Sequence, residues 1–319
     1  MKNTQVIQLM SIVRLSIFML GITMMSCNSK KEQQLPAIGK SVALFDYFSY
    51  KGNDDFYISN PLSDEDYFYN PILPGWYSDP SVCTNGEGDY FLVTSTFTYF
   101  PGVPIFHSKD LVNWKQIGHV LNRASQLVNM EGQKVSGGIF APAISYNPYN
   151  KTYYMVTINV GAGNFFVKTQ DPFGEWSEPV MLPEVGGIDP SFFFDEDGKA
   201  YIVNNDEAPD NKPEYSGHRT IRIQEFDVKT DKTIGPRKIL VNIGAQPAVK
   251  PIWIEGPHLY KINGKYFLMS AEGGTGNWHS EVIFCGDSPM GKFLPWKNNP
   301  ILTQRHLNSD RPNSVTCAG

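Results

Sequence analysis

Four segments of this chain share one plan, and this repeat constrains the fold more than any other feature. Each segment opens with a small or acidic residue and a proline, continues as a short apolar run, passes through a polar turn and ends in a run with aromatic residues. The segments are SDPSVCTNGEGDYFLVTS from Ser78, FAPAISYNPYNKTYYMVT from Phe140, IDPSFFFDEDGKAYIVNN from Ile188 and IEGPHLYKINGKYFLMSA from Ile254. Their turns have the residues that hairpin loops require, so each segment is predicted to be a β-hairpin.

A second pair of strand-like runs follows each hairpin, so each unit holds about four strands. The units open roughly 50 to 65 residues apart, as propeller blades with long loops would. Such a unit cannot bury both faces alone, so neighbouring units must stack around an axis. A β-sandwich also uses short strands, but the matched sets of strands favour an all-β propeller.

This geometry singles out three acidic residues. The first strand of each blade lines the central channel, so equivalent positions in successive blades point at one space. We assign that position to Asp79, Asp189 and Glu255 in the first, third and fourth units, and to Ala141 in the second. Carboxyl groups aimed at one cavity repel each other, and unlike environments separate a general acid from a general base. Glycoside hydrolysis needs such a pair, so we predict that all three are catalytic.

Six stretches from about Asn70 onward carry a family resemblance: NPILPGWYSDPS, YFPGVPIFHSKDLVNWKQIGH, SGGIFAPAI, GGIDPSFFFDEDGKAY, IEGPHLYKINGKYFLMSAEGG and NPILTQR. Together they resemble glycoside hydrolase family 43, in particular its β-xylosidases and α-L-arabinofuranosidases. The resemblance implies a five-bladed β-propeller that inverts anomeric configuration. It implies Asp79 as general base, Asp189 as the acid that tunes pKa and orients the substrate, and Glu255 as general acid. In an inverting site, the carboxyl groups of Asp79 and Glu255 would lie about 6.5 to 9.5 Å apart.

The end of the chain departs from the family pattern. Counting on from Glu255, a fifth unit should open near residue 319, which is the last residue. We therefore expect a propeller domain over residues 67–319 whose fifth blade is largely missing because the chain ends early. An open propeller exposes apolar surface, so we expect this chain to be less stable than a complete homologue.

Sugar subsites usually offer an aromatic face, and four aromatic residues lie near predicted strand starts or ends. These substrate-binding candidates are Trp76, Phe97, Phe140 and Trp278. With 20 Phe, 16 Tyr and 6 Trp in the chain, core packing is the alternative for each of them. Phe140 is the strongest candidate because it adjoins the channel position, although the family more often has Trp there.

Three other carboxyl groups compete for roles in the site. Glu272 lies at the far end of a strand, so we do not expect it to be the general acid. Asp206 and Glu207 follow a strand of the third unit, and we expect them to be solvated in a loop rather than to touch sugar hydroxyls.

The N-terminus predicts export. The apolar run Leu15–Met25 is too short to span a bilayer and fits the core of a signal peptide. Cys27 follows where bacterial lipoproteins are cleaved and lipidated. We expect a signal peptide with a lipoprotein-type cysteine over residues 1–27, a linker over residues 28–66, and a periplasmic or membrane-anchored bacterial protein. Cleavage without modification of Cys27 is the alternative.

Composition excludes several other functions. The net charge of −5 and the absence of a basic stripe argue against nucleic-acid binding. The chain has no CxxC or HExxH pattern, so the sequence requires no metal and no cofactor, while the resemblance allows a structural calcium ion. The expected partner is an oligosaccharide, with membrane contact only through the lipid anchor. A non-catalytic sugar-binding propeller and an endo-acting arabinanase stay open, as do xylose against arabinose specificity and the oligomeric state.

Overall fold

The computed structural model describes residues 55–62 and 67–307. The chain divides into two compact units, Met1–Pro61 and Leu62–Gly319. The first contains the helix α2 (Asp55–Ser59). No helix in the described ranges is long and apolar enough to cross a membrane. The predicted signal peptide with Cys27, most of the predicted linker and the expected start of a fifth unit near residue 319 lie outside the described residues.

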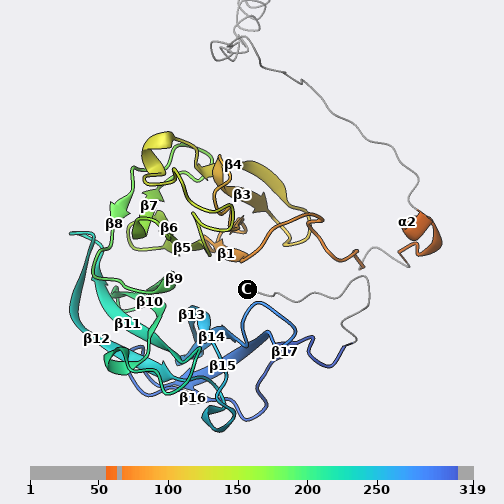
Figure 1. Cartoon of the computed structure of the whole chain (residues 1–319). Coiled ribbons are helices and arrows are strands. Elements are labelled where there is room, and N and C mark those ends of the chain that lie inside the picture. The colour runs from red at the N-terminus through yellow and green to blue at the C-terminus, as the bar shows by residue number, and fades with distance from the viewer. Residues whose placement is uncertain (1–54, 63–66, 308–319) are drawn as a thin grey trace, which may run out of the picture. The chain divides into compact units, whose positions relative to one another are not determined.

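Within residues 67–307, four antiparallel sheets each form a meander whose first four strands are hydrogen-bonded in chain order, as Figure 1 shows. The strands are β1 (Ser81–Thr84), β2 (Tyr90–Val93), β3 (Gly102–Ser108) and β4 (Lys115–Leu121); β5 (Ala143–Asn147), β6 (Thr152–Asn159), β7 (Gly163–Thr169) and β8 (Val180–Met181); β9 (Ile188–Phe194), β10 (Ala200–Glu207), β11 (Arg219–Asp227) and β12 (Lys232–Asn242); β13 (Glu255–Ile262), β14 (Lys265–Glu272), β15 (Ser280–Gly286) and β16 (Leu294–Pro295). A short strand β17 (Leu302–Thr303) also pairs with β15. Three 3₁₀ turns connect strands: η1 (Ala124–Gln126), η2 (Pro209–Asn211) and η3 (Pro247–Val249).

The first strand of each sheet lies nearest a common centre (Figure 1). β1 contacts β5, β5 contacts β9, and β9 contacts β13. The all-β prediction and the four repeat units are thereby confirmed as a propeller-like arrangement of four described blades.

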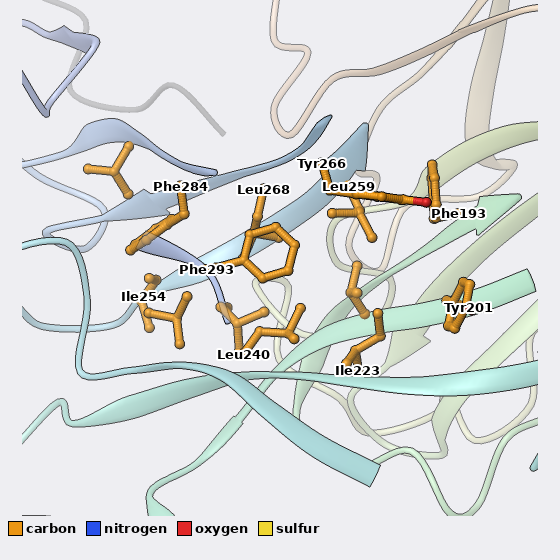
Figure 2. Packing of buried hydrophobic residues seen from close by; sticks show 14 of the residues in the cluster. Phe193, Tyr201, Ile223, Leu240, Ile254, Leu259, Tyr266, Leu268, Phe284 and Phe293 are labelled. Carbon is orange, nitrogen blue, oxygen red and sulfur yellow. The ribbon is translucent and has the colours of Figure 1, made fainter. Parts of the chain in front are cut away.

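Alternation along the strands builds a core on both faces of the inner sheets. On β6, Tyr153 and Met155 pack toward the β1–β4 sheet, whereas Tyr154 and Val156 pack toward the β9–β12 sheet. Successive side chains of a strand point to opposite faces, so one strand serves two interfaces. Figure 2 shows the cluster between the third and fourth sheets, to which Phe193, Tyr201, Ile223, Leu240, Leu259, Tyr266, Leu268 and Phe284 contribute.

Serine hydroxyl groups connect the inner strands across these interfaces. The amide of Ile144 donates to Ser81 Oγ at 3.1 Å. The hydroxyl of Ser145 donates to the carbonyl of Phe192 at 2.9 Å, and that of Ser191 donates to the carbonyl of Pro257 at 2.5 Å. Each inner strand is therefore hydrogen-bonded to the next one around the centre.

The core interfaces give a stability prediction. Leu268 is fully buried between the third and fourth sheets. Leu268→Ala should lower the free energy of unfolding by about 2–5 kcal/mol, because it removes buried methyl groups and leaves a cavity. Urea unfolding measures this change. Leu294→Ala is the matched control: its side chain is 56% exposed, so we expect a change within about 0.5 kcal/mol. Equal losses for the two variants would contradict the assigned core.

Candidate active site

The structure brings the three predicted acids into one pocket. Asp79 directly precedes Pro80 and β1, Asp189 lies in β9, and Glu255 opens β13. All three line a pocket of about 660 Å³, a volume within the range of small-molecule sites. The juxtaposition predicted from the repeat is therefore present.

The backbone conformation shows which position of the repeat each of the three acids occupies. Asp79 and Asp189 have left-handed φ values of 55° and 53°, each directly before a proline. In the fourth sheet the residue with this conformation is Gly256, with φ 55°, and it precedes Pro257. Glu255 thus lies one residue before the position equivalent to Asp79, which corrects the register assigned from the sequence. A non-glycine residue in the left-handed region costs on the order of 1–3 kcal/mol, and such strain clusters at functional sites.

Hydrogen bonds hold two of the carboxylates. The hydroxyl of Ser95 donates a hydrogen bond to Asp79 Oδ2. The amide of Gly256 donates to Asp189 Oδ2 at 3.0 Å. Because Gly256 follows Glu255 in the chain, Asp189 is held against the backbone beside Glu255.

The environment raises the pKa of two of the acids. Burial raises the pKa of Asp189 to about 8, and the negative charges of Glu255 and Asp79 add to this effect, while the Gly256 hydrogen bond opposes it. Burial, followed by the charge of Asp79, raises the pKa of Glu255 to about 7, and Arg219 partly opposes this. Glu255 therefore keeps a proton to near-neutral pH, as a general acid must.

Three of the four aromatic candidates line the pocket: Trp76, Phe97 and Phe140. Trp76 is 65% exposed, and its ring stacks on that of Phe97, with centroids 5.4 Å apart and planes inclined by 8°. Phe97 meets Phe140 edge to face at 5.6 Å. Trp278 is not among the lining residues, and the guanidinium of Arg305 lies 5.7 Å above its ring. The structure thus gives an exposed aromatic face beside the acids and leaves Trp278 outside it.

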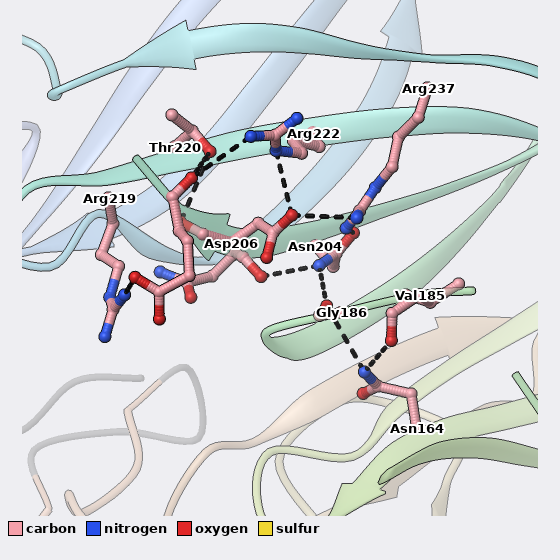
Figure 3. A network of polar contacts seen from close by, with 11 residues as sticks. Asn164, Val185, Gly186, Asn204, Asp206, Arg219, Thr220, Arg222 and Arg237 are labelled. Carbon is pink, nitrogen blue, oxygen red and sulfur yellow. Dashed lines mark hydrogen bonds and ion pairs between the residues drawn. The ribbon is translucent and has the colours of Figure 1, made fainter. Parts of the chain in front are cut away.

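The competing carboxylates do not line the pocket. Glu272 is buried and accepts a hydrogen bond from the amide of Ala245 at 3.0 Å. Asp206 lies within β10 and is buried between Arg222 and Arg237, at 3.0 and 2.9 Å, as Figure 3 shows. The predicted solvated loop is therefore wrong for Asp206, because β10 extends to Glu207 and two arginines neutralise the carboxylate.

Sequence reasoning missed two residues of the site: Ser95, whose hydroxyl donates to Asp79, and Glu281, which lines the wall of the pocket. Glu255 pairs with Ala271 on β14, and Ala271 pairs with Glu281 on β15, so Glu281 lies in the same row two strands away. Burial raises the pKa of Glu281 to about 7. No sequence signal marks this residue, because its place depends on the register between β14 and β15.

Among residues 55–62 and 67–307, no three side chains of His, Cys, Asp or Glu are grouped closely enough to hold a metal ion together. The calcium ion that the resemblance allows thus has no ligand set of this kind in the part of the chain that the structure describes.

A pocket at the centre of a propeller-like arrangement, with three facing acids, two of which have raised pKa values, and an aromatic face, defines a glycoside hydrolase type of site. The family model for glycosyl hydrolases family 43 matches residues 68–319. The chain belongs to this family.

Named relatives fit this membership. The chain is 47% identical over 246 residues to a xylosidase/arabinosidase of Butyrivibrio fibrisolvens, covering 76% of this chain and 46% of the relative. It is 41% identical over 243 residues to a non-reducing end α-L-arabinofuranosidase of Bacteroides ovatus, covering 74% and 42%. The crystal structure of a GH43_12 protein retrieved from capybara gut metagenome matches with a TM-score of 0.76 and 56% identity, over 81% of this chain and 48% of that one. The chain thus spans about half the length of these relatives.

Proposed function

We propose that this chain belongs to an inverting exo-glycosidase that removes terminal β-D-xylosyl or α-L-arabinofuranosyl residues from oligosaccharides of plant hemicellulose. The observation that carries the proposal is the meeting of Asp79, Asp189 and Glu255 in one pocket. The names of two relatives, a xylosidase/arabinosidase and a non-reducing end α-L-arabinofuranosidase, support the substrate class and the exo action.

In the proposed reaction, the terminal sugar lies against the exposed ring of Trp76. Glu255 donates its proton to the glycosidic oxygen as that bond breaks. Asp79 accepts a proton from water, which attacks the anomeric carbon from the opposite face. The carbon gains one C–O bond and loses another, and the sugar leaves with inverted configuration.

Asp189 has a supporting role in this scheme. Its carboxyl group accepts from the amide of Gly256, beside Glu255. Its burial and the neighbouring negative charges favour the protonated form near neutral pH. A protonated Asp189 can donate to a sugar hydroxyl, whereas an ionised one would raise the proton affinity of Glu255 further.

A panel of chromogenic pentosides tests the activity, and proton NMR of the first product tests the stereochemistry. We expect release of xylose or arabinose from aryl β-D-xylopyranosides or α-L-arabinofuranosides, with the inverted anomer formed first. Binding of these sugars without turnover would favour the sugar-binding alternative. Cleavage inside arabinan chains would favour the endo-acting one.

The raised pKa of Glu255 gives a pH prediction. Because the general acid must carry its proton, kcat/KM should fall as pH rises through about 7. Arg219 lowers this pKa, so Arg219→Gln should move the basic limb to higher pH. Arg123→Gln removes an arginine that pairs with the surface residue Glu178 and should leave the limb unchanged. A basic limb near pH 4.5, the ordinary range of a glutamate, would contradict the assignment of Glu255.

On the sequence alone, we also propose export and lipid attachment at Cys27. Incorporation of labelled fatty acid into the expressed protein, and its loss in Cys27→Ser, tests this. A secreted protein without label would favour simple cleavage.

A further inference from the structure

Two adjacent asparagines on β10, Asn204 and Asn205, are almost fully buried, with 1% and 4% of their surface exposed. Their side chains point to opposite faces of the sheet, because neighbouring residues of a strand alternate. Burying a primary amide is costly unless it is hydrogen-bonded, so the partners of these two side chains show what they do.

Asn205 reaches the strand that carries Glu255. Its Nδ2 donates to the carbonyl of Ile254 at 2.6 Å. Ile254 is fully buried and directly precedes Glu255. This bond joins the third sheet to the fourth at the peptide from which the Glu255 side chain enters the pocket.

Asn204 reaches the segment that leads to Asp189. Its Nδ2 donates to the carbonyl of Gly186 at 2.6 Å, as Figure 3 shows. Asn164, on β7 of the neighbouring sheet, donates to the carbonyls of Val185 at 2.7 Å and Gly187 at 3.1 Å. Two sheets therefore hold this segment from both sides.

The same segment packs closely against the backbone of β10 at Gly187. Gly187 has a left-handed φ of 65°, and a Cβ there would lie 1.9 Å from the carbonyl oxygen of Asn205. The backbone of β10 is therefore in close contact with the residues that precede Asp189, and the side chain of Asn205 is hydrogen-bonded to the residue that precedes Glu255.

We propose that Asn204 and Asn205 are positioning residues, which fix the backbone ahead of Asp189 and ahead of Glu255 respectively. This inference rests on the proposed function for its catalytic meaning. Carboxyl groups must be held to within a fraction of an ångström for acid catalysis, and buried side-chain hydrogen bonds to the backbone provide that order.

Burial and neighbouring charges set the pKa of each acid, so a carboxyl group that moves should show a measurable change in its pKa. The charged and titratable groups around Glu255 are Asp79, Asp189 and Arg219, which lie on other elements, and Glu281 and His258, which lie on its own sheet. Burial is the largest cause of its raised pKa, so a carboxyl group released toward water must lose part of that increase.

The experiment is a ¹³C NMR titration of side-chain carboxyl groups in the full chain. The wild type is compared with Asn205→Ala and Asn204→Ala, and signals are assigned with Glu255→Gln and Asp189→Asn. We expect Asn205→Ala to lower the pKa of Glu255 by about one pH unit, and Asn204→Ala to lower that of Asp189 by a similar amount. Ser145→Ala is the control, since it removes a hydrogen bond between inner strands that ends at Phe192.

The inference requires each asparagine variant to shift the pKa of its own acid more than that of the other acid. If neither asparagine variant shifts its own acid, or if both shift the two acids equally, the inference is overturned. Asn205→Ser, which keeps a polar group but is too short to reach Ile254, serves if the alanine variant does not fold. This titration needs no turnover, so it separates failure of the inference from failure of the proposed hydrolase activity.

Kinetics add a second readout. With a mispositioned general acid, Asn205→Ala should lose more activity on a xyloside with a poor leaving group than on a dinitrophenyl xyloside, whose leaving group needs little protonation. A uniform loss on both substrates would indicate a purely structural role and would overturn the inference.

Discussion

Glu255→Gln is expected to lower kcat by about 10²–10⁴-fold for a pentoside whose leaving group needs a proton, because the amide cannot supply one. The loss should be much smaller for a dinitrophenyl pentoside. Steady-state rates on a series of aryl pentosides measure this, and the slope against leaving-group pKa should steepen in the variant.

Glu281→Gln is the matched control for this change. Both glutamates line the pocket, and burial is the largest cause of the raised pKa of each, to about 7. The same one-atom exchange at Glu281 should keep kcat within about tenfold, as expected outside the proton-transfer step. If the leaving-group effect appears in Glu281→Gln and not in Glu255→Gln, the two assignments must be exchanged.

A melting experiment shows whether Glu255→Gln loses activity because the protein unfolds or because the proton donor is missing. Because the pKa of Glu255 is raised in the folded chain, the folded state loses stability as pH rises from the unfolded value of about 4.3 through about 7. Glutamine removes that ionisation. Glu255→Gln should therefore melt at or above the wild-type temperature at pH 8.

Asp79→Asn is expected to lower kcat by a similar factor of about 10²–10⁴, but for every leaving group alike. The reason is that, in the proposed reaction, Asp79 accepts the proton of the attacking water, a step that does not involve the departing oxygen. Rates on the same aryl pentoside series measure it, and the dependence on leaving-group pKa should match the wild type.

Asp110→Asn serves as the control for Asp79→Asn. Asp110 lies between β3 and β4 of the first sheet, where its carboxylate accepts hydrogen bonds from Asn113 in a surface turn. It does not line the pocket. We expect it to be fully active. A dinitrophenyl-selective recovery in Asp79→Asn would instead make Asp79 the proton donor.

The repeat allowed the sheets to be predicted because each one is a local meander. The openings, turns and aromatic runs of one unit lie within a single stretch of sequence, so patterns of apolar and turn residues describe it completely. The number of blades around the axis depends instead on how the sheets twist and stack. The expectation of five blades therefore came only from the family resemblance.

The site was predictable where it depended on the repeat. Asp79 and Asp189 share a motif and a left-handed backbone, whereas Glu255 is displaced by one residue because Gly256 takes that conformation. Glu281 lines the pocket because of the register between β14 and β15, which no local pattern encodes, and Ser95 reaches Asp79 from a position 16 residues further along the chain.

Asp206 shows a further limit of sequence reasoning. Its polarity indicated a solvated loop, but Arg222 and Arg237 from neighbouring strands neutralise it inside the sheet. A buried carboxylate is acceptable when charged partners satisfy it, and those partners are distant in sequence. Polarity alone therefore mispredicts burial wherever a strand carries ion pairs.

The order of strands along the chain also bears on how the protein is made. Each meander is complete as soon as its last strand leaves the ribosome, but one of its apolar faces has to wait for the following meander to be synthesised. At about 5–20 residues per second, that wait lasts on the order of seconds. During this interval the unpaired face exposes apolar side chains to water, so the partly made chain is most prone to aggregate between the appearance of one blade and the next.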